Sequence, residues 1–335
     1  MVVALVAATA PSALPPQAAP QSPTEGATLL RNSGGQSARY SGIGQLVGPR
    51  TCTAWLLATS GRGPAYAIAN GRCGSLSSTQ TIVDRPVRGV TLEFRRFVDT
   101  PGARLKVAVK RIVWSSAKGT DLTVFALDRP LAALRARGVR PLRIAPGMPG
   151  PGSKVESVGI PVAGVAREER MLRRSRCTTR PGLERLVEGA WLWYDVIPSN
   201  CRGIAGGGLG SPLLDRRTGR VLGVINTTTL RGDRLPSCYT GRPCEVRGGK
   251  SLRPRPNATY ALPVTALRAC FTQSGRFRLG GSCPLDTRGW LTATTPSVGV
   301  NPDVPDPVTR FPQTTWDVSI EGREIASDRR RGSRN

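Results

Sequence analysis

The residues that could carry chemistry in this sequence are a glycine-rich loop and a separate aspartate. The loop Gly206–Ser211 precedes an apolar run, and Asp121 stands at the head of another apolar run. Acyl transfer by a serine or cysteine needs a base that titrates near neutral pH. The chain has no histidine. A Ser-His-Asp triad, a Cys-His dyad and a histidine metal site are therefore excluded.

The composition is strongly basic. The 335 residues include 48 Lys and Arg against 22 Asp and Glu, a formal net charge of +26, and only five of the basic residues are lysines. Such a charge attracts acidic polymers and surfaces, and it says nothing about the fold. Part of the charge is explained by genomic composition, because Arg, Ala, Gly and Pro, which are all abundant here, have GC-rich codons.

Two basic clusters are candidate anion-binding sites. One lies before Cys177 and comprises Arg170, Arg173, Arg174 and Arg176, and the other is Arg329–Arg331 near the C-terminus. Either cluster could hold the phosphate or carboxylate groups of nucleic acid, teichoic acid or a cell-surface glycan. A solvated loop has the same pattern, and that interpretation is slightly favoured. Aromatic residues are not interleaved with the clusters, which weakens the case for specific binding of single-stranded nucleic acid.

The N-terminus and the cysteines indicate export. Met1–Ala10 is a short apolar run that ends in a small-residue cleavage pattern, although no basic residue precedes it, so the signal peptide is read as incomplete at its N-terminus. No segment is long enough to span a bilayer. The eight cysteines lack the close pairs of a zinc site, and disulfides are favoured over reduced thiols. No metal or cofactor is predicted. The cysteines are Cys52, Cys73, Cys177, Cys201, Cys238, Cys244, Cys270 and Cys283.

Short apolar segments separated by Gly and Pro turns predict an all-β domain between two less regular ends. Residues 1–38 are interpreted as a leader and linker, residues 39–272 as the domain, and residues 273–335 as a Cys-containing extension with a flexible Pro/Arg-rich tail. Alternation over Leu105–Lys110 predicts a half-exposed strand, and Val221–Ile225 predicts a buried one. Helical signal is confined to 130–137 and 263–271.

Three segments, in order, resemble the trypsin-like (chymotrypsin-fold) serine proteases, most closely the secreted bacterial members. They are Thr51–Leu57 with Ala65–Cys73, then Gly119–Leu127, then Gly206–Asp215 with Gly219–Asn226. The resemblance covers roughly residues 40–271 and implies a two-barrel β fold with short helices. It also implies a Cys52–Cys73 disulfide, whereas the pairs 177/201, 238/244 and 270/283 rest only on proximity in the sequence.

The resemblance also assigns catalytic positions, and two of the three hold residues that cannot do the chemistry. Arg72 stands at the histidine position, Asp121 at the aspartate position and Leu209 at the serine position. A guanidinium stays protonated and a leucine has no nucleophilic atom. Gly207 and Leu209 occupy the oxyanion-hole positions, and Gly203 would lie near the bottom of the first specificity pocket.

The sequence therefore predicts an exported, catalytically inactive pseudoprotease with a binding or structural role, whose partner is a peptide, a protein or an acidic polymer. Arg72 is expected to pair with Asp121 beside a cleft between the barrels. The alternative is an active hydrolase that uses displaced residues, for example Ser211 with Lys118 as base. Ser211 lies two residues past the nucleophile position, where a structural serine is expected.

Overall fold

The structure is a computed structural model that describes residues 22–60, 63–74, 81–117, 120–189, 191–204, 206–229, 238–247 and 250–285. The predicted signal peptide, Lys118 and the tail from residue 286, with Arg329–Arg331, lie outside the described residues. Within the described part, no helix is long and apolar enough to cross a membrane.

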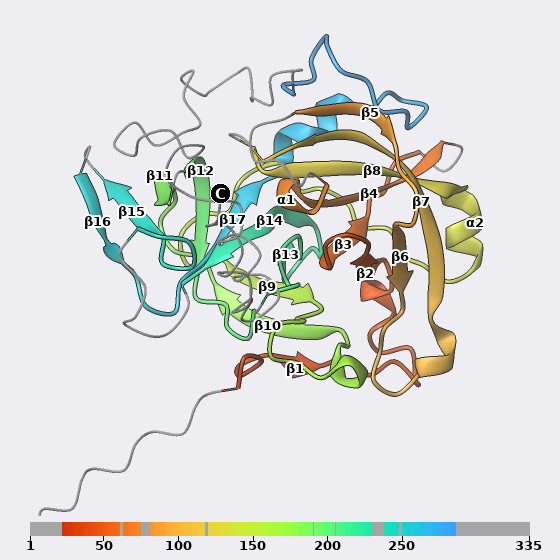
Figure 1. Cartoon of the computed structure of the whole chain (residues 1–335), viewed down its shortest axis with the longest axis horizontal. Helices are drawn as coiled ribbons and strands as arrows, with labels where there is room; N and C mark the ends of the chain where they lie inside the picture. Colours follow the sequence, from red (N-terminus) through yellow and green to blue (C-terminus); the bar gives the residue numbers. More distant parts are fainter. Residues whose placement is uncertain are drawn as a thin grey trace, which may run out of the picture.

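The first sheet closes into a six-stranded antiparallel barrel, drawn on the right in Figure 1. Its strand order is β7-β6-β2-β3-β4-β8, and β8 returns to pair with β7. β6 pairs with the first part of β7, residues 105–108, and β5 pairs with its later part, residues 111–115. The strands are β2 (Ile43–Val47), β3 (Cys52–Leu56), β4 (Pro64–Asn70), β5 (Ile82–Pro86), β6 (Thr91–Phe94), β7 (Leu105–Ser116) and β8 (Leu122–Pro130). Closure leaves the barrel strands without unpaired edges.

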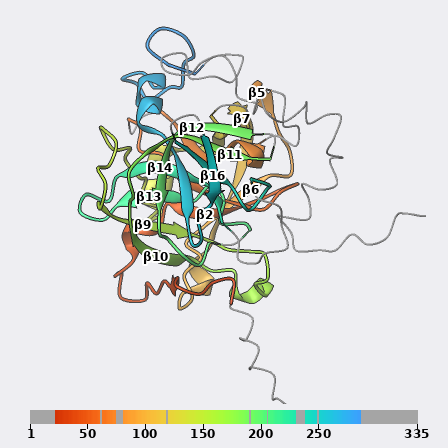
Figure 2. The ribbon, with the colours of Figure 1, turned by 90° about the vertical axis from the view of Figure 1, so that its left-hand side faces the viewer.

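The second sheet has ten strands in the order β1-β10-β9-β13-β14-β17-β12-β11-β15-β16. An antiparallel bridge between Thr179, just after β10, and Ser199 of β12 joins two strands that are far apart in this order, so six of the strands form a second barrel. Figure 2 views the molecule from this side. The strands are β1 (Thr28–Leu29), β9 (Lys154–Gly159), β10 (Arg173–Thr178), β11 (Leu183–Glu188), β12 (Trp191–Ser199), β13 (Pro212–Asp215), β14 (Val221–Thr228), β15 (Cys244–Arg247), β16 (Lys250–Pro254) and β17 (Thr259–Pro263).

Helices are few and short, as the sequence predicts. Among the described residues, the α-helices are α1 (Gly71–Gly74) and α2 (Leu131–Ala136), and short 3-10 helices cover Ala38–Tyr40, Pro101–Ala103, Arg167–Glu169 and Thr265–Cys270. In β7, Val107 and Val109 are buried while Lys106 and Lys110 are exposed, and Val221–Ile225 is buried throughout. The all-β, two-barrel architecture is confirmed.

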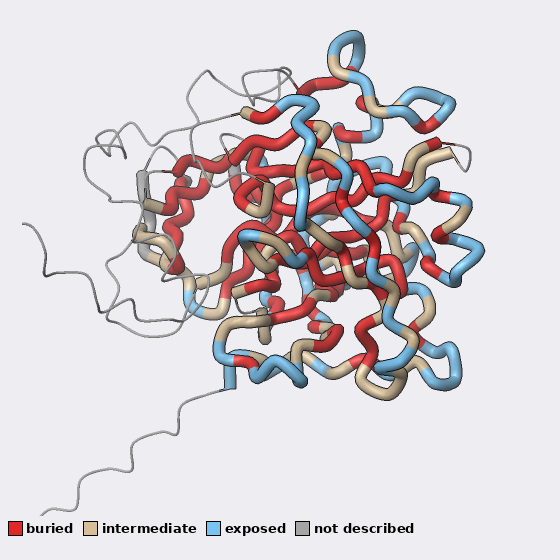
Figure 3. The backbone as a smooth tube through the Cα atoms, turned by 45° about the vertical axis from the view of Figure 1, so that its right-hand side comes forward, coloured by how far each residue is buried: buried red, intermediate tan, exposed pale blue. Residues whose placement is uncertain are grey.

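The hydrophobic core is continuous across the two barrels. One cluster joins Trp55, Ile68 and Trp114 of the first barrel to Val158 and Val224 of the second. Further clusters fill the interior of each barrel. Figure 3 shows the buried chain in the interior of the molecule and the exposed chain in its outer loops. Burial of this shared apolar surface holds the barrels against each other, at roughly 25 cal/mol per Å² removed from water.

The four disulfides join Cys52–Cys73, Cys177–Cys201, Cys238–Cys244 and Cys270–Cys283, which are the pairs that the sequence suggests. The ends of the described chain are part of the fold as well. Residues 28–29, which the sequence analysis assigns to the linker, form β1 and pair with Arg173 and Arg174 of β10. Cys283 lies in the predicted extension, and its disulfide ties that extension to the domain.

Gly71 marks a place where the fold has no room for a side chain. A Cβ atom at this position would lie 2.0 Å from the carbonyl oxygen of Ser116 and 2.8 Å from the backbone nitrogen of Leu122. We expect Gly71→Ala to lower the free energy of unfolding by about 1–3 kcal/mol, because neither neighbour is a flexible side-chain end. Urea unfolding measures the loss. Gly147→Ala is the control, since a Cβ there has no neighbour within 4 Å; equal midpoints for both variants would contradict the packing described.

Candidate functional site

The end of β4 and the start of β8 bring the predicted histidine and aspartate positions together. β4 ends at Asn70, and α1 begins at Gly71, so Arg72 lies one residue inside this helix. The Cys52–Cys73 disulfide fastens the helix to β3. Asp121 directly precedes β8, with a positive φ of 42° that places it in the left-handed region. Both side chains therefore start from closely restrained backbone.

Arg72 and Asp121 form a buried ion pair. The Arg72 Nη2 atom lies 3.1 Å from Asp121 Oδ2, and Arg72 Nε donates to the same oxygen at 3.2 Å. The backbone N–H of Arg72 donates to Asp121 Oδ1 at 3.1 Å. Arg72 is 8% exposed and Asp121 is fully buried. A buried carboxylate needs this number of donors to compensate for lost hydration.

Two asparagines complete the network and extend it into the second barrel. The Asn70 amide donates to Asp121 Oδ2 at 2.7 Å, and the Asn226 amide donates to the same oxygen. Arg72 Nη2 in turn donates to the Asn226 carbonyl oxygen at 2.7 Å, and Asn226 belongs to β14. Burial raises the pKa of the Asp121 carboxyl above its usual value, while the charge of Arg72 and the Asn70 hydrogen bond act against that rise.

Trp193 and Glu188 lie near this network, and the sequence analysis missed both. The guanidinium carbon of Arg72 lies 5.9 Å from the centre of the Trp193 ring, within the range of a cation–π contact. Glu188 is buried, and its Oε1 accepts hydrogen bonds from the Thr227 hydroxyl at 2.6 Å and from the Gly241 N–H at 3.0 Å. Asn70 and Asn226 were also missed; their signal is a polar residue that ends or interrupts an apolar run.

The glycine-rich loop is fixed through its carbonyl groups. The Gly206 oxygen accepts from two backbone N–H groups, the Gly207 oxygen from the Thr53 hydroxyl, and the Leu209 oxygen from the Thr53 N–H at 3.0 Å. Within the described residues, the N–H groups of Gly207 and Leu209 have no hydrogen-bond acceptor. Leu209 itself is half-buried.

The neighbouring glycine packs this loop against the end of β4. A Cβ atom at Gly210 would lie 3.1 Å from the backbone nitrogen of Asn70 and 2.2 Å from the Thr53 oxygen. Gly210 also has a φ of 89°, which disfavours any other residue. The loop that carries Leu209 is therefore held beside the strand that leads into Arg72.

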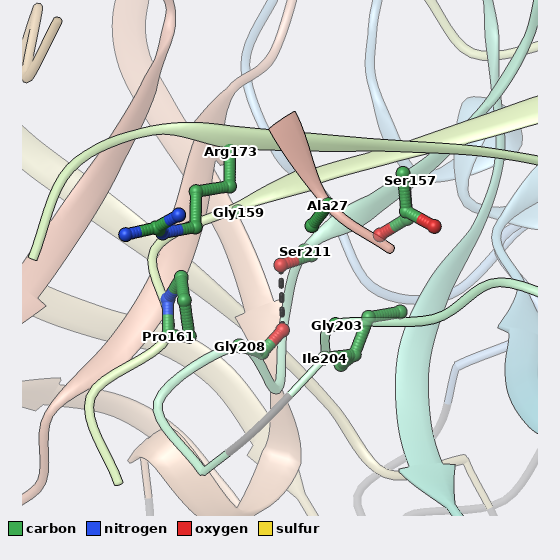
Figure 4. Close-up of a pocket in the computed structure, with 10 residues that line it drawn as sticks. Ala27, Ser157, Gly159, Pro161, Arg173, Gly203, Ile204, Gly208 and Ser211 are labelled. Atoms are coloured by element: carbon green, nitrogen blue, oxygen red, sulfur yellow. Dashed lines mark hydrogen bonds between the residues drawn. The ribbon is translucent and has the colours of Figure 1, made fainter. Parts of the chain in front are cut away.

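Ser211 is a buried structural serine. It is 1% exposed, and its hydroxyl donates to the Gly208 carbonyl oxygen at 2.5 Å, the dashed contact in Figure 4. The backbone N–H of Ser211 donates to the same carbonyl at 3.1 Å. Gly159 lies so close that an added Cβ would be 1.9 Å from the Ser211 oxygen. The hydroxyl thus closes the loop on itself and is packed on its other side.

Gly203 lies under the N-terminal segment. An added Cβ would meet the Ala27 Cβ at 2.6 Å and the Thr24 oxygen at 2.8 Å. Ala27, Gly203 and Ser211 all line the small pocket of Figure 4, together with Arg173 of β10. The N-terminal segment therefore covers the residue that the resemblance places at the bottom of the first specificity pocket.

The arginines before Cys177 do not share one surface. Arg170 lies before β10, and its Nε donates to the Val165 oxygen at 3.0 Å. Arg173 lines the pocket of Figure 4, whereas Arg174 and Arg176 are one and three positions further along β10. Because successive side chains of a strand point to opposite faces, Arg173 is separated from Arg174 and Arg176. Of the four, only Arg176 is exposed.

Comparison with known proteins gives similarities to solved structures only; no family model and no curated protein matches the chain. The active form of the Rv3671c protease from M. tuberculosis is 14% identical, with 81% of this chain and 98% of that one covered and a TM-score of 0.43. The MamO protease domain from Magnetospirillum magneticum is 13% identical, with 70% and 98% covered and a TM-score of 0.45. A mutant of human heparin binding protein is 15% identical, with 72% and 92% covered and a TM-score of 0.43. Identities this low say nothing about activity, substrate or partner.

The buried pair makes a prediction about stability. Arg72→Met removes the cation and leaves Asp121 buried without its ionic partner, so we expect a loss of about 3–5 kcal/mol in the free energy of unfolding at neutral pH. Adding Asp121→Asn to this variant should recover part of the loss, because a neutral amide needs no cation. Denaturant titration of the two single variants and the double variant measures the coupling. Strictly additive losses would show that the two side chains do not interact.

Proposed function

We propose that this chain is an exported trypsin-like pseudoprotease, a protease-type scaffold that has lost acyl-transfer chemistry and serves a binding or structural role. In this proposal, residues 39–272 form the protease-like domain, preceded by a leader and linker and followed by an extension and tail. The observation that carries it is the guanidinium of Arg72, which pairs with Asp121 where a catalytic base would have to be.

The chemical reason is specific to each position. Acyl transfer requires a group that accepts a proton from the nucleophile, and an arginine does not accept one near neutral pH. The nucleophile position is Leu209, whose side chain has only carbon and hydrogen atoms. Asp121 has no imidazole to orient, and its carboxylate is occupied by Arg72, Asn70 and Asn226. None of the three residues can therefore play its part in acyl transfer, and the ion pair between Arg72 and Asp121 supports a structural role for the site.

The alternative, an active hydrolase with displaced residues, has less support. Ser211 would have to leave the Gly208 carbonyl and become accessible, since it is 1% exposed and hydrogen-bonded in the fold. Lys118, its candidate base, lies outside the described residues. A serine that is packed against Gly159 is positioned to shape the loop.

A binding role is compatible with the loop that remains. The N–H groups of Gly207 and Leu209 have no acceptor among the described residues, while the loop carbonyls are engaged. Two free N–H groups on a restrained loop can hold a carboxylate or another anion without any reaction. The four disulfides support the exported location, because disulfides persist in oxidising compartments. An origin among bacterial secreted proteins belongs to the same proposal.

We expect the purified protein to hydrolyse peptide and ester substrates no faster than background, and a serine-directed phosphonate probe to leave it unlabelled. The double substitution Arg72→His with Leu209→Ser should gain labelling by this probe, because both missing groups are then supplied. Each single substitution should gain little, since base and nucleophile act as a unit. Mass spectrometry of the labelled protein identifies the modified residue.

The controls separate the two functions. Ser211→Ala in the unmutated background should not change probe labelling, and in the double variant the label should map to the new serine at position 209. Strong labelling of the unmutated protein, lost on Ser211→Ala, would overturn the pseudoprotease proposal and establish the displaced-serine alternative.

A further inference from the structure

The connection between the two barrels carries an unpaired basic surface. Residues 131–148 join β8 to the second barrel and contain four arginines but no Asp or Glu. All four are exposed, and within the described residues their guanidinium groups form no ion pair or hydrogen bond. These residues, here called the connection arginines, are Arg135, Arg137, Arg140 and Arg143.

Apolar residues of the same segment anchor it and force the arginines outward. Leu134, Val139, Leu142 and Ile144 are buried, and each of the connection arginines lies within two positions of one of them. α2 begins this segment on the outer side of the first barrel, at the right of Figure 1. The four arginines are therefore all exposed to solvent within one short stretch of chain.

The backbone of the connection is fixed to both barrels. Leu142 exchanges two hydrogen bonds with the end of β3, donating to the Leu56 oxygen at 2.8 Å and accepting from the Ala58 N–H at 2.7 Å. One residue later, the Arg143 oxygen accepts from the N–H of Val221 in β14 at 2.8 Å. The backbone beneath the connection arginines therefore loses little conformational entropy when a ligand binds, and the entropic cost of binding falls on the arginine side chains.

A fifth arginine adds charge to the same place. Arg95, which follows β6 and is half-buried, donates from Nη1 to the Arg137 carbonyl oxygen at 3.2 Å. The clustered arginines before Cys177 lack this arrangement, because Arg173 lies in the pocket of Figure 4 and only Arg176 of the four is exposed. The connection is thus the better polyanion surface, although the sequence analysis did not single it out.

We propose that the connection arginines bind a linear phosphate polymer, which lies along the segment from Arg135 to Arg143. The planar guanidinium fork matches two phosphate oxygens, and a row of forks matches a repeating anion. Residues 131–148 contain no Phe, Tyr or Trp, so the segment offers no aromatic side chain for a base to stack on, and its four guanidinium groups favour contacts with phosphates. This inference deepens the proposed binding role and rests on it, but it uses a surface distinct from the Arg72 site.

The test is binding of fluorescently labelled short-chain inorganic polyphosphate to the full chain, followed by anisotropy over a range of salt concentrations. Replacing all four connection arginines by glutamine should weaken binding more than about tenfold at low salt. It should also make the slope of log K against log salt shallower by about 3, since each phosphate contact contributes roughly 0.7. The replaced side chains are exposed, and circular dichroism checks that the variant is folded.

The matched control removes the same charge elsewhere. Arg85, Arg88, Lys106 and Lys110 are exposed on and beside β5 and β7, and their replacement by glutamine should change affinity less than about threefold. Equal losses in both variants would mean that net charge alone attracts the polymer, and would overturn the proposal, as would absence of binding. Equally tight binding of polyglutamate would overturn the preference for phosphate. Polymer binding and phosphonate labelling are measured separately and concern different sites. A failure of the polyphosphate proposal is therefore distinguishable from a failure of the pseudoprotease proposal.

Discussion

The structure depends on the hydrogen bonds that replace the lost hydration of one fully buried carboxylate, that of Asp121. Asp121 receives hydrogen bonds from Asn70 at the end of β4, from Arg72 in α1 and from Asn226 in β14. Because burying a charge without donors costs several kcal/mol, these elements must meet at one point. The barrels are thereby joined by a polar network next to their shared apolar core. An arginine at position 72 satisfies this constraint through three contacts: to Asp121, to Asn70 and to the Asn226 carbonyl.

In the proposed function, the same constraint would keep the fold intact without a catalytic base and nucleophile. The geometry of the glycine loop depends on Thr53 and on the Ser211 hydroxyl, and neither contact involves the side chain at position 209. The network around Asp121 depends on donors, and an arginine supplies more of them than an imidazole does. A protein that loses its base and nucleophile can therefore retain both the loop and the junction between the barrels. Loss of activity and loss of fold are separate events in such a molecule.

Strand periodicity and motif order predicted more of this molecule than charge did. The alternation over β7, the buried run of β14 and the pairing of Arg72 with Asp121 follow from local pattern or from the order of three segments. Asn226 and Trp193 could not be found in this way, because they reach Arg72 only through tertiary packing. The arginines of β10 are neighbours in the sequence but are divided between two faces of the strand by its alternation. The connection arginines are more widely spaced, yet all four are exposed, because the apolar residues between them take the buried positions.

The hydrogen bonds of Leu142 and Arg143 also bear on how the chain unfolds. This short stretch belongs to neither barrel, yet it completes backbone pairing on both, at Leu56 and at Val221. Neither barrel can open alone without exposing backbone groups of the other and the apolar cluster between them. Two domains connected by a loose linker would unfold in separate steps. The hydrogen bonds of Leu142 and Arg143 instead couple the two barrels into one cooperative unit.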